Sequence, residues 1–524
     1  MSTASTKANN NVTFIDAMLR KKPVDDNSSS VEDKPALKPT LSFKYVVLYG
    51  IAGVVGAGIF ESPAKIIREQ TGPAVVLSFM IAAIACAFTG ICYADFAAKH
   101  PSAGGSYAYI YSSLGEYCAF LAGVGNTFEY AFSGAAVARS WSGYLQALFP
   151  SLAIAQISMK GAIISPDIYA PMISLAMAAI CLLGVKQSTK LSAILTVTNI
   201  SAIIFIICVG ASYIDTSNYT PFFPFPASGI FRGSTDAIFS FIGWDAVCVL
   251  SEDVKEPKKT IPRAIFTVLG LASVLYCCLL AVLTGMKPFT EIAPVASLIS
   301  VFPQGHYAQY VISVLVLLCS TNTTYATTQG NPMIWYSMAR DGLLPAKFRA
   351  VDKNNTPYFS VIGTGILMVC ISGLFNFDFI AGATTSAVLL VQGLVCLGCL
   401  LGRVDSQDYA ANKGSIKTCL AINVFAIVAC AGFYGETNDT LDAATVLAFV
   451  YVQWFLVAVA AVTGLLVVCW SKTYGSLIPL IALMTNFFLV GISGFWALAQ
   501  LAIILASFSL LYFSYGLTHS KLAI

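Results

Sequence analysis

Charged residues are scarce in this chain. Only 10% of its 524 residues are Asp, Glu, Lys or Arg, whereas soluble domains contain about 25%. Hydrophobic residues account for 57% of the sequence, and the mean hydropathy is +0.77. This composition excludes a soluble enzyme with a single membrane anchor. It predicts an all-α integral membrane protein that crosses the bilayer many times.

Residues that support catalysis or bind metals are also scarce. The histidines are His100, His306 and His519, and no nucleophile–base pair can be assembled around them. Fifteen cysteines lie in or beside apolar runs, and even Cys396 and Cys399 lack further ligands. We interpret the cysteines as small core residues. We therefore expect no enzymatic activity, no cofactor and no metal site, and without a basic folded domain we expect no nucleic acid partner.

The chain begins with a polar tail and continues as a series of apolar runs. Residues 1–43 predict a mostly disordered tail without a cleavable signal peptide. Within this tail, residues 14–22 either form a short amphipathic helix on an anionic leaflet or stay unstructured. The runs that follow predict twelve to fourteen transmembrane helices, at about 44–66, 73–98, 115–149, 168–185, 190–213, 234–252, 262–286, 306–338, 358–375, 380–402, 417–435, 443–470, 476–493 and 495–516.

Basic residues are distributed unevenly between the loops on the two sides. If the N-terminus lies inside and the helices alternate, the cytoplasmic segments hold 23 of the 29 Lys and Arg residues and the outer loops hold 5. Arg139 lies within the third run. This bias predicts that both termini are cytoplasmic, with residues 517–524 as a short tail. Since no organellar address is recognisable, the plasma membrane is the default expectation.

The first apolar run contains an interruption. Residues 46–60 read VVLYGIAGVVGAGIF, and Gly56-Ala57-Gly58 would destabilise a continuous helix there. Non-helical backbone in a membrane survives only when it is buried in protein or lines a wet cavity. We therefore predict a discontinuous first helix whose unwound centre binds a small zwitterion. The alternative is a helix–helix contact surface made of small residues.

The sixth run contains a second interruption. Phe239-Ser240-Phe241-Ile242-Gly243-Trp244-Asp245 places a glycine and an acid inside an apolar run. Interruptions at matching positions of two five-helix sets indicate an inverted repeat with the substrate at its interface. We expect a 5+5 transporter core, made of residues 44–213 and 234–402, followed by about four additional transmembrane helices within residues 417–516.

Several motifs resemble those of one known superfamily. They are Gly56-Ala57-Gly58-Ile59-Phe60, the FIGWD motif at 241–245, and Met338-Ala339-Arg340-Asp341-Gly342-Leu343-Leu344-Pro345. They resemble the amino acid–polyamine–organocation superfamily. Within it, the chain is most similar to the cationic amino acid transporters, on the basis of Met18-Leu19-Arg20-Lys21-Lys22, Glu129-Tyr130, Val137-Ala138-Arg139-Ser140-Trp141-Ser142 and Gly184-Val185-Lys186-Gln187-Ser188. Fourteen helices also fit that branch.

The two interruptions supply the candidate substrate-binding residues. At the first, Val55, Gly56, Ala57 and Gly58 form a half-helix N-terminus whose amides suit a carboxylate. For the second interruption, the resemblance implies that an α-ammonium meets carbonyl groups. The resemblance places these carbonyl groups at Phe239, Ser240 and Ile242, with Trp244 and Asp245 beside them.

The two remaining residues of that set each have alternative roles. Trp244 stands where the family usually has Phe, and it either covers the substrate or packs in the core. Asp245 is an acid within the membrane and therefore a functional candidate. It orients the unwound turn, holds a water molecule or attracts a cationic side chain, and we favour the first role. Met333 is another departure from the family, because the family usually has Arg after the proline of the eighth run.

Glu129, Asn199 and Asp95 are the candidate coupling and gating residues. Glu129 lies in the middle of the third run, where a lone carboxylate must be protonated or paired. In proton-coupled relatives its partner is a Lys, and the resemblance places Asn199 there. Either Glu129 is a neutral hydrogen-bonding acid in a uniporter or exchanger, or it titrates and couples protons. Asp95 belongs either to a gate or to an interfacial pair with Lys99.

The sequence favours an amino acid transporter that works by alternating access. The resemblance implies cationic substrates such as arginine, lysine or ornithine. A neutral or proton-coupled permease and a non-transporting sensor remain alternatives, whereas a channel would require a repeated filter that is absent from the sequence. Besides substrate and membrane lipids, protons remain an open partner. Residues 150–167 contain no cysteine, so we expect no covalently attached heavy chain.

Overall fold

The computed structural model describes most of the chain. The described residues are 18–22, 41–99, 104–152, 163–182, 188–251, 254–293, 298, 301–302, 307–352, 356–403, 477–492 and 495–520. In this part of the chain all regular elements are helices, and extended pairing is limited to two isolated bridges. The all-α prediction is therefore confirmed for the described residues.

Twelve of the predicted apolar runs coincide with helical segments, some of them interrupted. The runs at 417–435 and 443–470 lie outside the described residues. The segments are α2 (Phe43–Val54), α3 (Ala57–Ile66), α4 (Val75–Lys99), α6 (Glu116–Thr127), η3 (Phe128–Phe132), α7 (Ser133–Leu148), α8 (Tyr169–Leu182), α9 (Ser188–Ala211), α10 (Ala227–Phe241), α11 (Ala246–Val249), α12 (Pro257–Met286), α14 (Tyr307–Arg340), α15 (Tyr358–Leu374), α16 (Phe377–Arg403), α19 (Leu477–Ile492) and α20 (Phe495–Leu511).

Length and composition identify membrane-spanning helices independently of the sequence runs. Among the described residues, four helices are long and apolar enough to cross a membrane, namely Gly58–Lys99, Pro257–Met286, Gln309–Arg340 and Phe377–Gly402. Further apolar helices are shorter, as expected where a spanning segment is broken or only partly described. These helices support a multi-pass membrane protein.

Three segments differ from the sequence prediction. Helix α10 begins at Ala227, directly after Pro226, rather than at 234. The nine-residue helix α5 (Gly105–Ser113) was not predicted because it is short and lacks an apolar periodicity. In the expected C-terminal tail, Leu517–His519 forms the helical turn α21 and Ser520 is buried. The tail therefore starts inside the packed structure.

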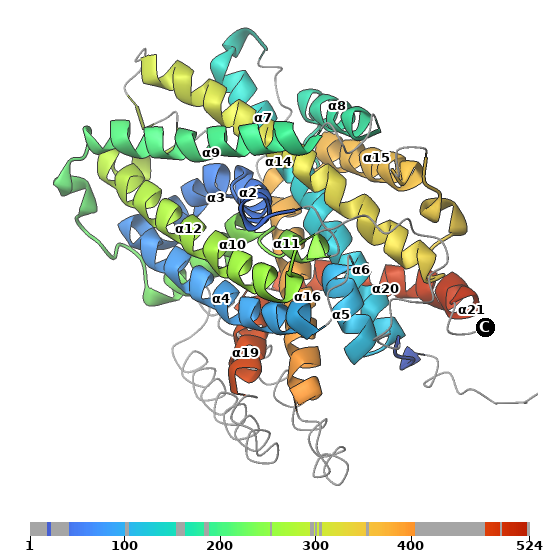
Figure 1. The fold of residues 1–524 in the computed structure, drawn as a ribbon. Helices are drawn as coiled ribbons and strands as arrows, with labels where there is room; N and C mark the ends of the chain where they lie inside the picture. Colours follow the sequence, from blue (N-terminus) through green and yellow to red (C-terminus); the bar gives the residue numbers. More distant parts are fainter. Residues whose placement is uncertain are drawn as a thin grey trace, which may run out of the picture.

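The helices form two groups that meet around the broken helices (Figure 1). One group contains α2, α4, α10 and α12, in which α4 packs against α10 and α12, and α12 packs against α2; the other contains α7, α8, α14 and α15. Helix α9 lies between the groups and contacts α2, α12 and α14, while α16 packs against α4, α6 and α19. The first group thus contains the first and second helices of each predicted five-helix set, and the second group contains the third and fourth helices of each set.

Candidate functional site

Helix α2 ends at Val54, and α3 begins at Ala57. Between them, Val55 and Gly56 leave the helical conformation, and Gly56 has φ −144° and ψ −154°. Gly56 precedes α3 as its N-cap without a side chain to cap the helix. The first amides of α3 consequently have no partner within that helix. The predicted interruption of the first helix is present.

The second interruption separates α10 from α11. Helix α10 ends at Phe241, and its C-cap Ile242 has φ −56° and ψ 139°. Gly243 follows with φ +101°, a conformation that favours glycine. The last carbonyl groups of α10 therefore lie where the chain turns away from the helix axis.

The two interruptions are in direct contact through glycines. A Cβ at Gly58 would lie 2.5 Å from Ser240 Cα, and a Cβ at Gly53 would lie 3.0 Å from the Gly243 carbonyl oxygen. A Cβ at Gly56 would lie 2.5 Å from Thr323 Cγ2 on α14. These glycines are thus needed for close approach of backbones as well as for the break.

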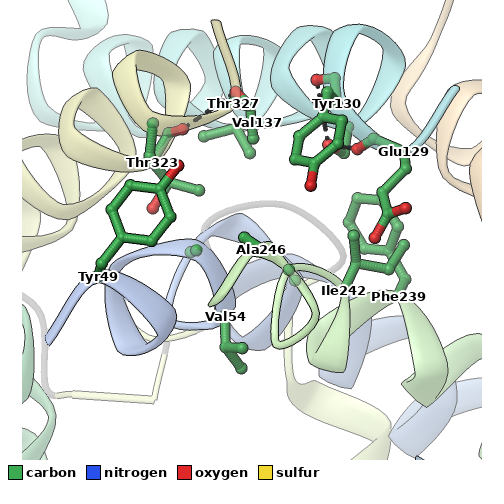
Figure 2. A pocket seen from close by; sticks show the side chains of 16 residues that line it. Tyr49, Val54, Glu129, Tyr130, Val137, Phe239, Ile242, Ala246, Thr323 and Thr327 are labelled. Carbon is green, nitrogen blue, oxygen red and sulfur yellow. Dashed lines mark hydrogen bonds between the residues drawn. The ribbon is translucent and has the colours of Figure 1, made fainter. Parts of the chain in front are cut away.

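A cavity with about 560 Å³ of atom-free space lies beside the two interruptions. Figure 2 shows Tyr49 and Thr323 at one end of it and Glu129 with Phe239 and Ile242 at the other. The lining residues come from α2, α3, η3, α7, α10, α11 and α14. They are Tyr49, Gly53, Val54, Gly56, Gly58, Glu129, Tyr130, Ser133, Val137, Phe239, Ile242, Gly243, Ala246, Thr323, Ala326 and Thr327.

Two opposite helix ends face this cavity. Gly56 and Gly58 belong to the N-terminus of α3, where free amides and the helix dipole favour an anion. Phe239 and Ile242 belong to the C-terminus of α10, where the helix dipole and the last carbonyl groups favour a cation. The Phe239 carbonyl oxygen also accepts from the Ile242 amide over 3.4 Å. A zwitterion that fits between these ends would meet complementary partial charges.

Glu129 supplies the carboxyl group in the cavity lining. Its side chain is 2% exposed, and Asp245 is 5% exposed. The two carboxyl groups lie within hydrogen-bonding reach of one another, while Glu129 Oε1 and Asp245 Oδ1 have no donor among the described residues. Because two ionised carboxylates repel strongly in an apolar interior, this pair needs a proton or a cation.

Comparison with known proteins identifies the family. Residues 41–460 match the model described as amino acid permease. The chain belongs to the amino acid permease family. This match, together with relatives named cationic amino acid transporters, confirms the resemblance inferred from the motifs.

The individual relatives have different names. The permease is 33% identical over 408 residues to the methylthioribose transporter of Bacillus subtilis (strain 168), covering 76% of this chain and 88% of the relative. It is 29% identical over 404 residues to a branched-chain amino acid permease of the same organism, covering 75% and 87%. It is 31% identical over 419 residues to the vacuolar cationic amino acid transporter 4 of Arabidopsis thaliana, covering 77% and 70%. The family is one of multi-pass membrane transporters.

The predicted substrate-binding residues divide into two sets. Gly56, Gly58, Phe239 and Ile242 line the cavity of the permease. Three others are next to lining residues. The Val55 carbonyl oxygen accepts a hydrogen bond from Thr323, Ala57 is the first residue of α3, and the Ser240 backbone contacts Gly58. The hydroxyl group of Ser240 is buried and has no partner among the described residues.

Trp244 does not lie over the cavity. Its side chain is fully buried, and its ring lies 4.9 Å from that of Tyr93 on α4 in an edge-to-face contact. Gly90, also on α4, faces the same indole. Gly243, with its left-handed backbone, precedes Trp244, and the Trp244 side chain packs against α4 in this structure. A role of Trp244 in covering the substrate stays a prediction.

The coupling candidates lie in three different places. Glu129 lines the cavity, and Asn199 is fully buried on α9, where its Nδ2 donates to the Val55 carbonyl oxygen over 3.3 Å. Asp95 lies near the end of α4, away from the cavity lining, where its Oδ2 is 3.0 Å from Lys99 Nζ. Asp95 is thus paired with Lys99 in this structure, while a role in a gate stays a prediction, and Asn199 contacts the first interruption.

The other charged groups of the third helix are paired. Arg139 is buried and lies 3.3 Å from Asp167, and its Nη2 donates to the Ser165 carbonyl oxygen over 2.7 Å. Glu116 accepts hydrogen bonds from the hydroxyl groups of Tyr111 and Tyr512, each at 3.0 Å. Neither residue reaches the cavity lining.

Sequence reasoning missed the contribution of α14. Thr323, Ala326 and Thr327 line the cavity opposite the interruptions. The sequence feature that could have indicated these residues is the run of Thr and Asn at 321–331, which lies within an otherwise apolar segment. Among the described residues no three His, Cys, Asp or Glu side chains are grouped closely enough to hold a metal ion.

Proposed function

We propose that this permease transports cationic amino acids such as arginine, lysine or ornithine by alternating access. The observation that supports it most is one cavity bordered by the α3 N-terminus, the α10 C-terminus and the carboxyl group of Glu129. The first two suit the α-carboxylate and α-ammonium of any amino acid. The carboxyl group distinguishes a cationic side chain from a neutral one.

Within this proposal the two five-helix sets form an inverted repeat and the cavity lies at their interface. The α-carboxylate binds the amides at Gly56 and Gly58, and the α-ammonium binds carbonyl groups at the end of α10. The cationic side chain extends to Glu129 and neutralises its carboxylate. Asp245 supports the second interruption beside it, and both termini lie in the cytoplasm of a cell whose plasma membrane holds the protein.

We further propose exchange or uniport without proton coupling. The position that holds a Lys in proton-coupled relatives is Asn199, whose neutral amide ties α9 to Val55. An amide does not titrate, so this contact persists at every physiological pH. Uptake measured with and without a pH gradient at clamped potential tests this step, and a strong dependence on the gradient would contradict it.

A neutral substrate is the second candidate. Val54, Val137, Ile242 and Ala326 make much of the lining apolar, and a branched-chain amino acid permease is among the relatives. An apolar side chain would bury these surfaces and leave a protonated Glu129 as a hydrogen-bonding group.

The deciding experiment is uptake of labelled L-arginine into proteoliposomes. Lysine, leucine, alanine and methylthioribose serve as unlabelled competitors, and no ion gradient is imposed. Competition by lysine alone supports the cationic proposal. Competition by leucine, or uptake of leucine without uptake of arginine, assigns the permease to neutral substrates. Competition by methylthioribose alone would exclude both amino acid proposals.

A further inference from the structure

Part of the polar tail is packed against the helices. Residues 18–22 lie against α5, α6 and the end of α14. Lys22 Nζ donates to Asp341 Oδ1 over 2.7 Å, and the Lys22 amide donates to the Tyr111 carbonyl oxygen over 3.3 Å. The backbone of Leu19 lies about 3.0 Å from where a Cβ of Gly115 would stand. Gly115 has φ +112° and permits this close approach.

Asp341 connects the tail to two further elements. It directly follows α14, and its side chain is 11% exposed. Besides Lys22, its carboxylate accepts a hydrogen bond from the Tyr107 hydroxyl group of α5 over 3.0 Å. A carboxylate this deeply buried is costly unless it is paired, so the ammonium of Lys22 stabilises the contact between α5 and α14.

Helix α5 in turn rests on the second broken helix. A Cβ at Gly105 would lie 3.3 Å from Val249 of α11, and the two helices pack against each other. Helix α11 directly follows the interruption, and its first residue, Ala246, lines the cavity. Asp341 therefore joins α14, which forms one wall of the cavity, to α5, and α5 packs against α11 at the α11 end of the cavity.

The segment before α2 makes a second contact at the same end. Leu41 pairs with Val254, and the Lys255 amide donates to the Leu41 carbonyl oxygen over 3.2 Å. This bridge ties the segment that precedes α2 to the segment that follows α11.

We propose that Lys22 is a latch that holds this end of the cavity closed through Asp341. Loss of the ion pair leaves a buried carboxylate that, among the described residues, retains only the hydrogen bond from Tyr107, which favours separation of α5 from α14. Residues 18–22 thereby bias the permease toward the state in which the tail-side end is shut. This inference rests on the alternating access proposed above and extends it to regulation by the tail.

Hydrogen exchange of the full-length protein in nanodiscs tests the latch without any substrate. We compare Lys22→Ala with Lys21→Ala, its exposed neighbour, which makes no ion pair among the described residues. Lys22→Ala should speed amide exchange in residues 105–113 and 246–249 by about fivefold, a factor that corresponds to about 1 kcal/mol. Lys21→Ala should leave both segments unchanged. Equal exchange in the two variants overturns the proposal.

A charge exchange makes the test specific for the ion pair. Asp341→Lys alone should speed exchange as Lys22→Ala does, and combining it with Lys22→Asp should restore slow exchange in residues 105–113. A double variant that exchanges as fast as the single ones would show that the pair does not act as a latch. Because no substrate is present, failure here leaves the proposed transport function standing, and failed arginine uptake leaves the exchange result standing.

Discussion

The two helix interruptions are held in different ways. At the first, the backbone carbonyl groups already have donors from other helices. The Val54 carbonyl oxygen accepts from the Tyr276 hydroxyl group over 2.9 Å. The Val55 carbonyl oxygen accepts from Asn199 over 3.3 Å and from Thr323 over 3.1 Å. Side chains from α9, α12 and α14 thus fix the unwound backbone.

The second interruption is held by short-range bonds. The Ala246 amide donates to the Gly243 carbonyl oxygen over 3.2 Å, and the Cys248 amide donates to Asp245 over 2.8 Å. Ser240 Oγ and Asp245 Oδ1 are buried without a partner among the described residues. The carbonyl groups of Val54 and Val55 at the first interruption therefore have donors, whereas the second retains two side-chain oxygens without a partner among the described residues. The substrate orientation proposed above relies on this difference.

The largest effect is expected where the two interruptions touch. Gly58→Ala places a Cβ 2.5 Å from Ser240 Cα, which is backbone and cannot rotate away. Overpacking of this kind costs about 1–3 kcal/mol, so we expect lower thermal stability and at least about tenfold slower uptake. Gly270→Ala is the control, because nothing lies within 4 Å of its Cβ. Equal behaviour of the two variants would mean that the interruptions need not touch.

The next largest effect is expected at the carboxyl group of Glu129, which lines the cavity. Glu129→Gln removes the charge from the cavity and keeps the size of the side chain. The KM for arginine should rise by about tenfold, equivalent to about 1.4 kcal/mol, while competition by alanine or leucine changes little. Kinetics of uptake measure both. An equal loss for cationic and neutral ligands would assign Glu129 to the fold and weaken the contrast between the interruptions.

A smaller effect is expected at the donors of the first interruption. Tyr276→Phe leaves the Val54 carbonyl group without its donor, which costs about 1–3 kcal/mol for a buried group. Thermal unfolding should occur at lower temperature, with the ratio of arginine to alanine uptake unchanged. Tyr310→Phe, at a position 59% exposed, serves as the control. A changed substrate ratio would show that this donor shapes the binding site as well.

The smallest effect on transport is expected at Trp244. Trp244→Phe leaves a void against Tyr93 and lowers stability by about 1 kcal/mol, but the KM for arginine should stay within about twofold. Uptake kinetics and thermal unfolding of the same preparation separate these two quantities. A large rise in KM at unchanged stability would return Trp244 to the substrate site.

The interruptions could be predicted from sequence because glycines and an acid inside apolar runs have few stable explanations in a membrane. Gly56, Gly58, Phe239, Ile242 and Glu129 were named on that basis or by resemblance, and all line the cavity. The contribution of α14 was not predicted, since Thr in a helix also satisfies itself on the preceding turn. Thr327 Oγ1 does this, donating to the Thr323 carbonyl oxygen over 3.0 Å.

Composition and the apolar runs alone determined the class of protein, the approximate positions of most described helices and the sites of its two interruptions. These are properties of consecutive residues, because each hydrophobic run must hydrogen-bond its own backbone in the bilayer. Only the tertiary structure decided that Trp244 faces the core, that Asn199 reaches Val55 and that Lys22 pairs with Asp341. Those contacts join residues that are distant in the chain, and packing of the whole bundle sets which side of each helix faces inward.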